Sequence, residues 1–292
     1  MKALVLGATG SIGTAIAKEL ATHGHEVLAL SRSDASEAGL AASGYATLRG
    51  DLRRPGEWAG IVRDVDAVIH AAATFTDDMG EVDRVLIDAL MDAAAPSSRS
   101  PVRFLYTGGC WLYGATGDAV ATEDSPFNPI PAFAWMVENA ERLIVSGKFS
   151  TAVIHPAMVY HRGGGVFTRF LEKARAGEPM EVWGGPETRW PLVHRDDLAV
   201  AYRLLMENRD LDGCFNASAQ TGVPVRDIVT AIATHHRGPT EIVTRTREEL
   251  VAEYGDWAEG PTLDQQMASE KLRHACNWRP RYEAFETSDL FA

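Results

Sequence analysis

The sequence has few cysteines, a deficit of positive charge and no long hydrophobic run. Its 292 residues include three cysteines, Cys110, Cys214 and Cys276, which are far apart and odd in number. They form no disulfide framework and no CxxC metal pair, so reduced thiols are expected. Lys and Arg total 28 against 40 Asp and Glu, a net charge of −12. This charge disfavours nucleic acid and anionic membranes as partners, because both require a basic face.

Membrane and export signals are also missing from the sequence. No apolar run approaches the ~20 residues that a membrane helix needs. The first residues, MKALVLGATG, predict a buried strand that leads into a turn, and no signal peptide is expected. We therefore expect a cytoplasmic protein that acts on a small molecule, without a metal site.

Short apolar runs alternate with helical patterns along the first two thirds of the chain. Strands that alternate with helices predict a parallel sheet covered on both faces, which is an α/β fold. After residue 156 the pattern loosens. The strands are expected at 2–8, 25–31, 66–72, 102–108, 150–156 and 191–195. The helices are expected at about 11–23, 77–95, 132–146, 195–208, 224–235, 246–254 and 264–275.

The segment GATGSIG, residues 7–13, follows a predicted strand and opens a predicted helix. Gly7 would allow a tight turn, Gly10 would let the backbone approach a pyrophosphate, and Gly13 would let the helix pack closely on the strand. The helix N-terminus would then offer its free N–H groups to phosphate. This context predicts a dinucleotide site.

The second predicted strand ends in LALSRS, so Ser31 and Arg32 lie where a carboxylate would bind the ribose 2′-hydroxyl of NAD. No carboxylate is present there. A guanidinium pairs well with a 2′-phosphate, which predicts NADP(H) as the cofactor. The alternative is a solvated surface arginine.

Further motifs follow in the order of one enzyme family. They are GDL (50–52), VIHAAA (68–73), LYTGGCWLYG (105–114), EDSPFNP (123–129), HPAMVYHRGGG (155–165), PLVHRDDLA (191–199) and FNAS (215–218). Together the chain resembles the extended, atypical short-chain dehydrogenases/reductases of the NAD-dependent epimerase/dehydratase type. The resemblance implies a doubly wound Rossmann domain with a small C-terminal substrate-binding lobe. The Rossmann domain would span 1–155 with a contribution from 191–220, and the lobe would comprise 156–190 and 221–292.

The resemblance also implies which residues contact the cofactor. Asp51 would accept a hydrogen bond from the adenine, and the small residues 71–73 would run under the cofactor. The complete set is Gly7, Thr9, Gly10, Ser11, Ile12, Gly13, Ser31, Arg32, Asp51, Leu52, Ala71, Ala72, Ala73, Thr107, Pro156 and Met158. A homodimer formed through the helices at about 80–95 and 132–146 is the family habit.

The proton-transfer residues of that family do not carry over. The family transfers hydride to or from nicotinamide, while a tyrosine exchanges the proton and a lysine four residues on assists it. In this sequence those two positions fall on Phe133 and Val137. Phenylalanine has no proton to donate and valine carries no charge. An atypical branch with a tryptophan and, three residues later, a glutamate would match Trp135 and Glu138.

Five residues are candidates for a non-standard proton donor. Tyr113 comes first, because it follows the strand whose end would face the nicotinamide; packing is its alternative role. Its neighbour Cys110 is otherwise a small apolar filler. Glu138 would need burial to raise its pKa and is otherwise a solvated helix carboxylate. Tyr160 and His161 follow a predicted strand end, where a loop histidine without a role is the alternative.

Aromatic residues dominate the segments expected around the substrate. Such a pocket suits a flat or apolar substrate better than a sugar nucleotide, with ordinary core packing as the alternative. Arg189 would clamp an anionic group by analogy with the family. Asp197 is expected to cap a helix. The expected pocket residues are Trp111, Phe133, Trp135, Trp183, Arg189 and Trp190.

Three functions are compatible with these features. The preferred one is an NADP(H)-dependent oxidoreductase that acts on a small carbonyl, imine or conjugated alkene. The second is a non-redox isomerase or cyclase on the same fold. The third is a catalytically silent regulatory protein that senses NADP(H).

Overall fold

The computed structural model describes residues 1–94 and 101–292 of the chain. These residues divide into two compact units, and each unit is made of three separate segments of the chain. The first unit comprises Met1–Gly108, Trp135–Ile154 and Leu198–Phe215. The second comprises Gly109–Ala134, His155–Asp197 and Asn216–Ala292. None of the helices in the described parts is long and apolar enough to cross a membrane.

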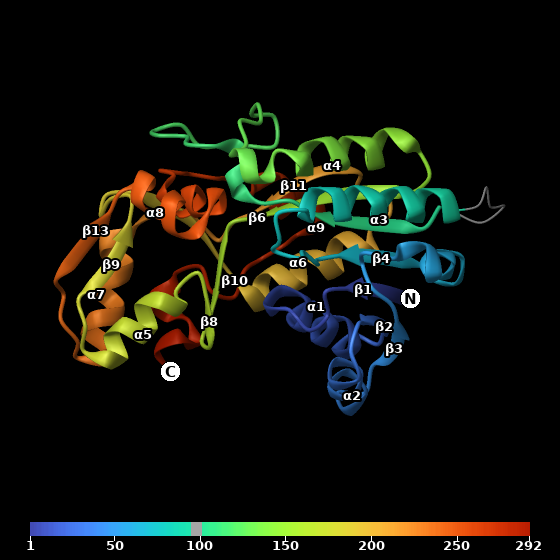
Figure 1. Ribbon diagram of the computed structural model, residues 1–292, viewed down its shortest axis with the longest axis horizontal. Helices are drawn as coiled ribbons and strands as arrows, with labels where there is room; N and C mark the ends of the chain where they lie inside the picture. Colours follow the sequence, from blue (N-terminus) through green and yellow to red (C-terminus); the bar gives the residue numbers. More distant parts are fainter. Residues whose placement is uncertain (95–100) are drawn as a thin grey trace. The chain divides into compact units, whose positions relative to one another are not determined.

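The first unit is built on a seven-stranded sheet with the order β11-β6-β5-β4-β1-β2-β3 (Figure 1). The pairs from β6 through to β3 are parallel. Strand order extends outward from β1 in both directions, which is the doubly wound arrangement. The expected fold class is therefore confirmed. The strands are β1 Lys2–Leu6, β2 Glu26–Ser31, β3 Ala46–Arg49, β4 Ala67–His70, β5 Arg103–Thr107, β6 Ser150–Pro156 and β11 Gly213–Ala217.

Helices cover both faces of this sheet (Figure 1). Helices α3 (Met79–Ala93) and α4 (Trp135–Ser146) lie on one face, and α1 (Ser11–Thr22) and α6 (Arg195–Glu207) lie on the other. Helix α2 (Asp34–Ala42) links β2 to β3. The helix expected at 77–95 is α3, although Ala95 lies outside the described residues.

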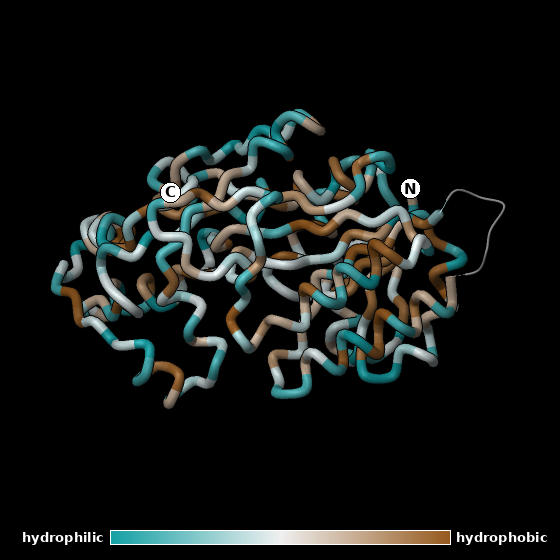
Figure 2. Tube along the Cα trace, turned by 90° about the horizontal axis from the view of Figure 1, so that it is seen from above, coloured by the Kyte–Doolittle hydropathy of each residue, from teal (hydrophilic) through white to brown (hydrophobic). Residues whose placement is uncertain are grey.

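Alternation along the strands builds the core between the sheet and the helices α3 and α4. Leu4, Phe104 and Val153 are buried from the strands, and they share one cluster with Leu86 and Leu143 from the helices. Each such side chain contributes about 1.5–3 kcal/mol by leaving water. In Figure 2 the hydrophobic stretches follow these strands near the N-terminus, while hydrophilic stretches follow many of the loops.

The second unit contains two smaller sheets. One has the order β12-β10-β7-β8 and the other pairs β13 with β9. Its strands are β7 Met158–His161, β8 Gly164–Gly165, β9 Met180–Trp183, β10 Arg189–His194, β12 Gln220–Pro224 and β13 Ile242–Arg245. Its helices are α5 Thr168–Ala176, α7 Val225–His236, α8 Arg247–Tyr254 and α9 Glu270–Cys276.

The helix expected at 264–275 is wrong in its first half, because α9 begins only at Glu270. The preceding backbone pairs with other segments of the second unit. The N–H of Gln265 donates to the carbonyl of Arg189 at 2.9 Å, and the N–H of Met267 donates to Thr221 at 2.9 Å. These long-range bonds hold the chain extended, although the local sequence has a helical pattern.

Candidate functional site

The turn between β1 and α1 has the geometry of a phosphate-binding turn. Gly7 adopts φ +91°, and a Cβ there would lie 2.5 Å from the carbonyl oxygen of Ala71. A Cβ on Gly13 would lie 2.0 Å from the carbonyl oxygen of Gly7. Only glycine fits these two positions, because any larger side chain would collide with backbone.

The N-terminus of α1 is left open beside that turn. Its N-cap is Gly10, which makes no side-chain cap, and the first turn of the helix carries no acidic residue. Thr9 and Ser11 are exposed on either side of Gly10. Uncapped N–H groups and the positive end of the helix dipole suit a pyrophosphate, so these residues could hold a dinucleotide.

Arg32 follows β2, at the position where the sequence analysis expects the ribose 2′ group of the cofactor. Its side chain is exposed, and it has no ion-pair partner among residues 1–94 and 101–292. Asp34, which follows it closely, is engaged by Arg49 at 2.6 Å. Ser31 is buried, and its hydroxyl bonds to Ser36 at 2.7 Å, which fixes the start of α2. The guanidinium of Arg32 is therefore available to a phosphate.

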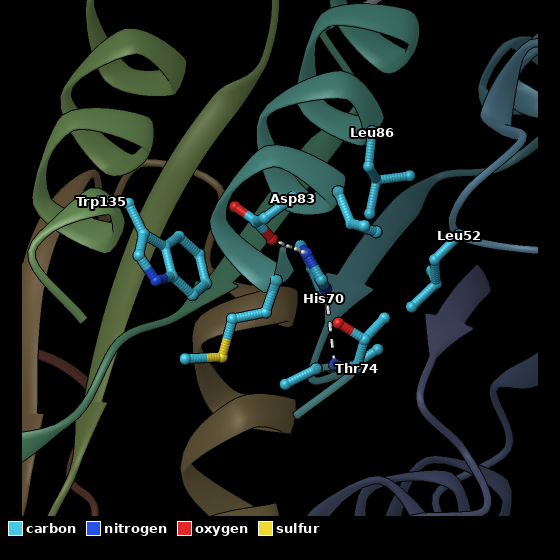
Figure 3. Close-up of a pocket in the computed structure, with 10 residues that line it drawn as sticks. Leu52, His70, Thr74, Asp83, Leu86 and Trp135 are labelled. Carbon is cyan, nitrogen blue, oxygen red and sulfur yellow. Dashed lines mark hydrogen bonds and ion pairs between the residues drawn. The ribbon is translucent and has the colours of Figure 1, made fainter. Parts of the chain in front are cut away.

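A pocket opens in the first unit where β4 ends (Figure 3). Leu52 and Ala72, which the sequence assigns to the cofactor, line it together with Trp135. Its lining residues are Leu52, His70, Ala72, Ala73, Thr74, Met79, Val82, Asp83, Leu86 and Trp135.

Two further residues of the expected cofactor set have defined local roles in the first unit. The carboxylate of Asp51 accepts a hydrogen bond from the backbone N–H of Arg53 at 2.9 Å. The hydroxyl of Thr107 donates to the carbonyl of His70 at 2.6 Å and also bonds to Tyr202 at 2.6 Å. Both contacts hold strand ends in place. Pro156 and Met158 belong to the second unit and are buried there.

A buried carboxylate joins the wall of this pocket to three other elements. Asp83 on α3 accepts hydrogen bonds from His70 at 2.6 Å, from Tyr106 at 2.8 Å and from Asn139 at 2.8 Å. All four side chains are at most 6% exposed. The sequence analysis did not select them. The available signal was an aspartate on the apolar face of a helix, beside Val82 and four residues from Ile87.

In the second unit, Cys110, Tyr113 and Tyr160 are buried. Burial raises the pKa of the Cys110 thiol to about 12 and also raises the pKa of Tyr160. The hydroxyl of Tyr113 donates to Asn216 at 2.8 Å. Three of the five candidate proton donors are therefore enclosed by protein, and the raised pKa values of Cys110 and Tyr160 make these two weaker acids than usual.

The remaining two candidate donors reach solvent. Glu138 is exposed on α4 of the first unit. His161 is partly exposed in the second unit, where burial, and then the charges of Arg195 and His194, lower its pKa. Its Nδ1 lies 3.1 Å from the backbone nitrogen of Gly163, so one ring nitrogen is committed to the loop.

Arg189 is already paired within the second unit. Its Nε and Nη2 donate to Asp264 at 2.9 and 2.6 Å, and its Nη1 donates to Asp118 at 3.2 Å. The Asp264 contact raises the pKa of Arg189, and Arg189 lowers the pKa of Asp264. Two carboxylates thus compensate the single positive charge of this arginine.

The expected pocket aromatics separate into different surroundings. In the second unit, Trp111 packs on Phe133 with ring centroids 5.6 Å apart. Trp190 is 2% exposed, donates to the carbonyl of Pro261 and stacks on Phe170, so it is a core residue. Trp183 is likewise buried, and the guanidinium of Arg169 lies 3.8 Å from its ring centroid.

Two smaller expectations of the sequence analysis can be compared with contacts in the second unit. Asp197 does not serve as a helix cap: its carboxylate accepts the backbone N–H groups of Arg281 and Tyr282 at 2.7 and 3.0 Å. It therefore anchors the C-terminal segment. In the parts of the chain that the structure describes, no group of three or more His, Cys, Asp or Glu side chains is arranged to hold a metal ion.

Comparisons with known proteins agree with the fold. The model of the NAD dependent epimerase/dehydratase family matches residues 3–217. The Saccharomyces cerevisiae protein named Uncharacterized protein YLL056C is 27% identical over 292 residues, which is 96% of this chain and 95% of that protein.

Two solved structures share the fold. UDP-glucose 4-epimerase of Thermus thermophilus, in complex with NAD, has a TM-score of 0.81 and 22% identity, with 100% of this chain and 99% of that chain covered. Human epimerase family protein SDR39U1 with NADPH has a TM-score of 0.77 and 20% identity, with 97% and 96% covered. Since the family model spans well over half of the sequence, the chain belongs to the NAD-dependent epimerase/dehydratase family.

Proposed function

We propose that this chain is an NADP(H)-dependent reductase of a small, uncharged organic molecule, such as a ketone, an imine or a conjugated alkene. The observation that carries the proposal is the open glycine turn, with the unpaired Arg32 one strand away. The turn would hold the pyrophosphate, and Arg32 would pair with the 2′-phosphate. The reduced cofactor, when bound, supplies a hydride to the substrate.

The compensated charge of Arg189 supports an uncharged substrate. An arginine that clamps a diphosphate needs its guanidinium fork free, because the bidentate contact uses both N–H directions. In this chain Asp264 occupies that fork and Asp118 adds a second negative charge. Replacing these contacts with a phosphate would break two ion pairs and place like charges side by side.

The proton that completes the reduction would come from a group other than the usual tyrosine. The helix α4 reads WMVENAERLIVS and contains neither tyrosine nor lysine. His161 and Glu138 are the candidate donors that reach solvent, whereas Tyr113 is enclosed. We propose that the donor is one of these two groups, and substrates that accept hydride readily, such as activated alkenes, need the least help from it.

Cofactor titration tests the first part of the proposal. Fluorescence titration of the wild type should give tighter binding of NADPH than of NADH. Arg32→Glu should weaken NADPH binding at least about tenfold, because it replaces an attractive charge with a repulsive one. Lys18→Glu, the same change of charge on the exposed side of α1, should leave both affinities unchanged. Binding of neither cofactor by the wild type would refute the proposal.

Turnover tests the second part. A panel of ketones, imines and conjugated alkenes is offered with NADPH, next to dTDP-4-dehydro-6-deoxy-D-allose, a keto sugar that carries a diphosphate, as the charged comparison. We expect NADPH oxidation with at least one neutral compound and none with the nucleotide sugar. Product formation without any change in NADPH absorbance would indicate an isomerase or cyclase instead. An inert panel despite tight NADPH binding would favour a regulatory protein.

A further inference from the structure

The buried carboxylate of Asp83 is the meeting point of four elements in the first unit. It lies on α3 and receives donors from β4, β5 and α4, namely His70, Tyr106 and Asn139. Figure 3 shows Asp83 and His70 facing each other, with Trp135 on the other side of Asp83. These contacts connect residues that are up to 56 positions apart in the sequence.

All three partners of Asp83 donate, which requires an acceptor in each direction. Oδ1 takes the bond from His70, and Oδ2 takes both remaining bonds. An ionised carboxylate accepts in every direction, whereas an amide would turn an N–H group toward at least one donor. A buried charge adds little to stability compared with a well-packed apolar residue. We therefore expect Asp83 to act by holding the groups that it bonds in place.

One branch of the network leads to the glycine turn. Because a carboxylate only accepts, His70 donates from Nε2, and a neutral ring leaves Nδ1 as an acceptor. The backbone N–H of Ala72 lies 3.4 Å from that Nδ1. The backbone of 71–72 is in turn in direct contact with Gly7, since a Cβ on Gly7 would come within 2.5 Å of the Ala71 oxygen and 2.9 Å of Ala72 Cα.

The other branch leads to α4. Asn139 donates to Asp83, and Trp135 lies one helical turn earlier on the same face. Trp135 packs so closely on α3 that a Cβ on Gly80 would lie 2.9 Å from its ring. Both Trp135 and Asp83 line the pocket. The bond from Asn139 therefore fixes the separation of the two helices at the pocket wall.

We infer that Asp83 is a positioning residue for cofactor binding, which acts through His70 on the backbone at 71–72 and through Asn139 on α4. The inference rests on the proposed use of NADP(H). It makes Asp83 a positioning and not a catalytic residue, because the carboxylate is buried and already accepts hydrogen bonds from three side chains.

The test compares NADPH affinity in three variants whose folding is verified by thermal unfolding. Asp83→Asn should weaken NADPH binding about tenfold, because one charge-assisted hydrogen bond becomes a donor facing a donor. Asp92→Asn, on the exposed side of the same helix, should bind as the wild type does. Ile87→Val, a buried truncation next to the network, should lower the unfolding temperature and leave the affinity within twofold.

His70 provides the second arm of the test, which decides the matter should Asp83→Asn not fold. The amide nitrogen of glutamine in His70→Gln can reach Asp83, but the amide oxygen lies one bond farther from the backbone than Nδ1 of the imidazole, so it no longer faces the Ala72 N–H. This variant should therefore also weaken NADPH binding several-fold. In a double-mutant cycle, Asp83→Asn and His70→Gln should be strongly non-additive, since both interrupt one path.

Two results would overturn the inference. One is NADPH affinity within twofold of the wild type in Asp83→Asn or, if that variant does not fold, in His70→Gln. The other is an equal loss of affinity in Ile87→Val, because the effect would then follow stability and not position. Failure of the proposed function looks different: the wild type itself would bind neither NADPH nor NADH.

Discussion

His155 is a buried imidazole without a hydrogen-bond partner among the described residues. It is 1% exposed, both ring nitrogens are unpaired, and it packs against Tyr113 and Phe127 with ring centroids 5.7 and 5.4 Å away. Burial lowers the pKa of His155 to about 4. The side chain therefore stays neutral in the folded protein at pH values where an unfolded chain would already take up the proton.

The buried His155 predicts that the free energy of unfolding of the second unit falls as the pH is lowered. The pKa of His155 is lower in the folded than in the unfolded state. As the pH falls through about 6.5, the unfolded state binds the proton first, so the free energy of unfolding decreases. The decrease ends near pH 4, where the folded state binds the proton too. The loss attributable to His155 is about 3 kcal/mol over that window. Denaturant titrations at pH 7, 6 and 5 measure it. His155→Phe should flatten this dependence, whereas His274→Gln, an exposed control, should keep it; an unchanged slope in His155→Phe contradicts the prediction.

At the scale of the element, the β1–α1 turn and α2 offer a matched pair of glycines. A Cβ on Gly13 would lie 2.0 Å from the Gly7 oxygen, whereas a Cβ on Gly39 in α2 meets nothing within 4 Å. Gly13→Ala should destabilise the protein by about 1–3 kcal/mol, because the helix must move off the strand, and should weaken NADPH binding. Gly39→Ala should stabilise by about 0.5–1 kcal/mol, because alanine is the better helix former.

Chemical denaturation and NADPH titration on both alanine variants check this pair. Equal stability changes in the two variants would mean that the close approach at Gly13 relaxes without cost. A destabilised Gly13→Ala that still binds NADPH as tightly as the wild type would separate the packing role of this glycine from the phosphate site.

On the scale of the whole chain, Asp197 fastens the C-terminal segment within the second unit. Its carboxylate accepts the N–H groups of Arg281 and Tyr282, and its backbone carbonyl accepts from the buried Trp278. Asp197→Ala should cost about 3 kcal/mol, because two backbone N–H groups lose a charged acceptor. Asp196→Asn, its exposed neighbour, should change stability by less than about 0.5 kcal/mol.

Denaturation together with limited proteolysis checks the role of Asp197. In Asp197→Ala we expect early cleavage near residues 278–285, which the wild type and Asp196→Asn resist at the same protease concentration. Resistance equal to that of the wild type would show that packing of Trp278 alone holds the segment.

The sequence by itself determined the fold class, the family and the glycine turn. These features are local: strand and helix periods are written in consecutive residues, and the collision that requires Gly13 arises with Gly7, six residues earlier. The short β3 escaped prediction, because its four residues are only partly buried and form no apolar run. The extended chain at 265–268 escaped it, because its backbone bonds go to Arg189 and Thr221, which are distant in sequence.

Only the tertiary structure decided which polar groups are free and which are committed. Arg189 looked available in the sequence, but Asp264, 75 residues later, occupies its guanidinium. Asp83 was not selected from the sequence, but β4, β5 and α4 close over it and supply its three donors. Electrostatic pairing depends on distance in space, and no local pattern of residues encodes which distant side chain will complete a pair.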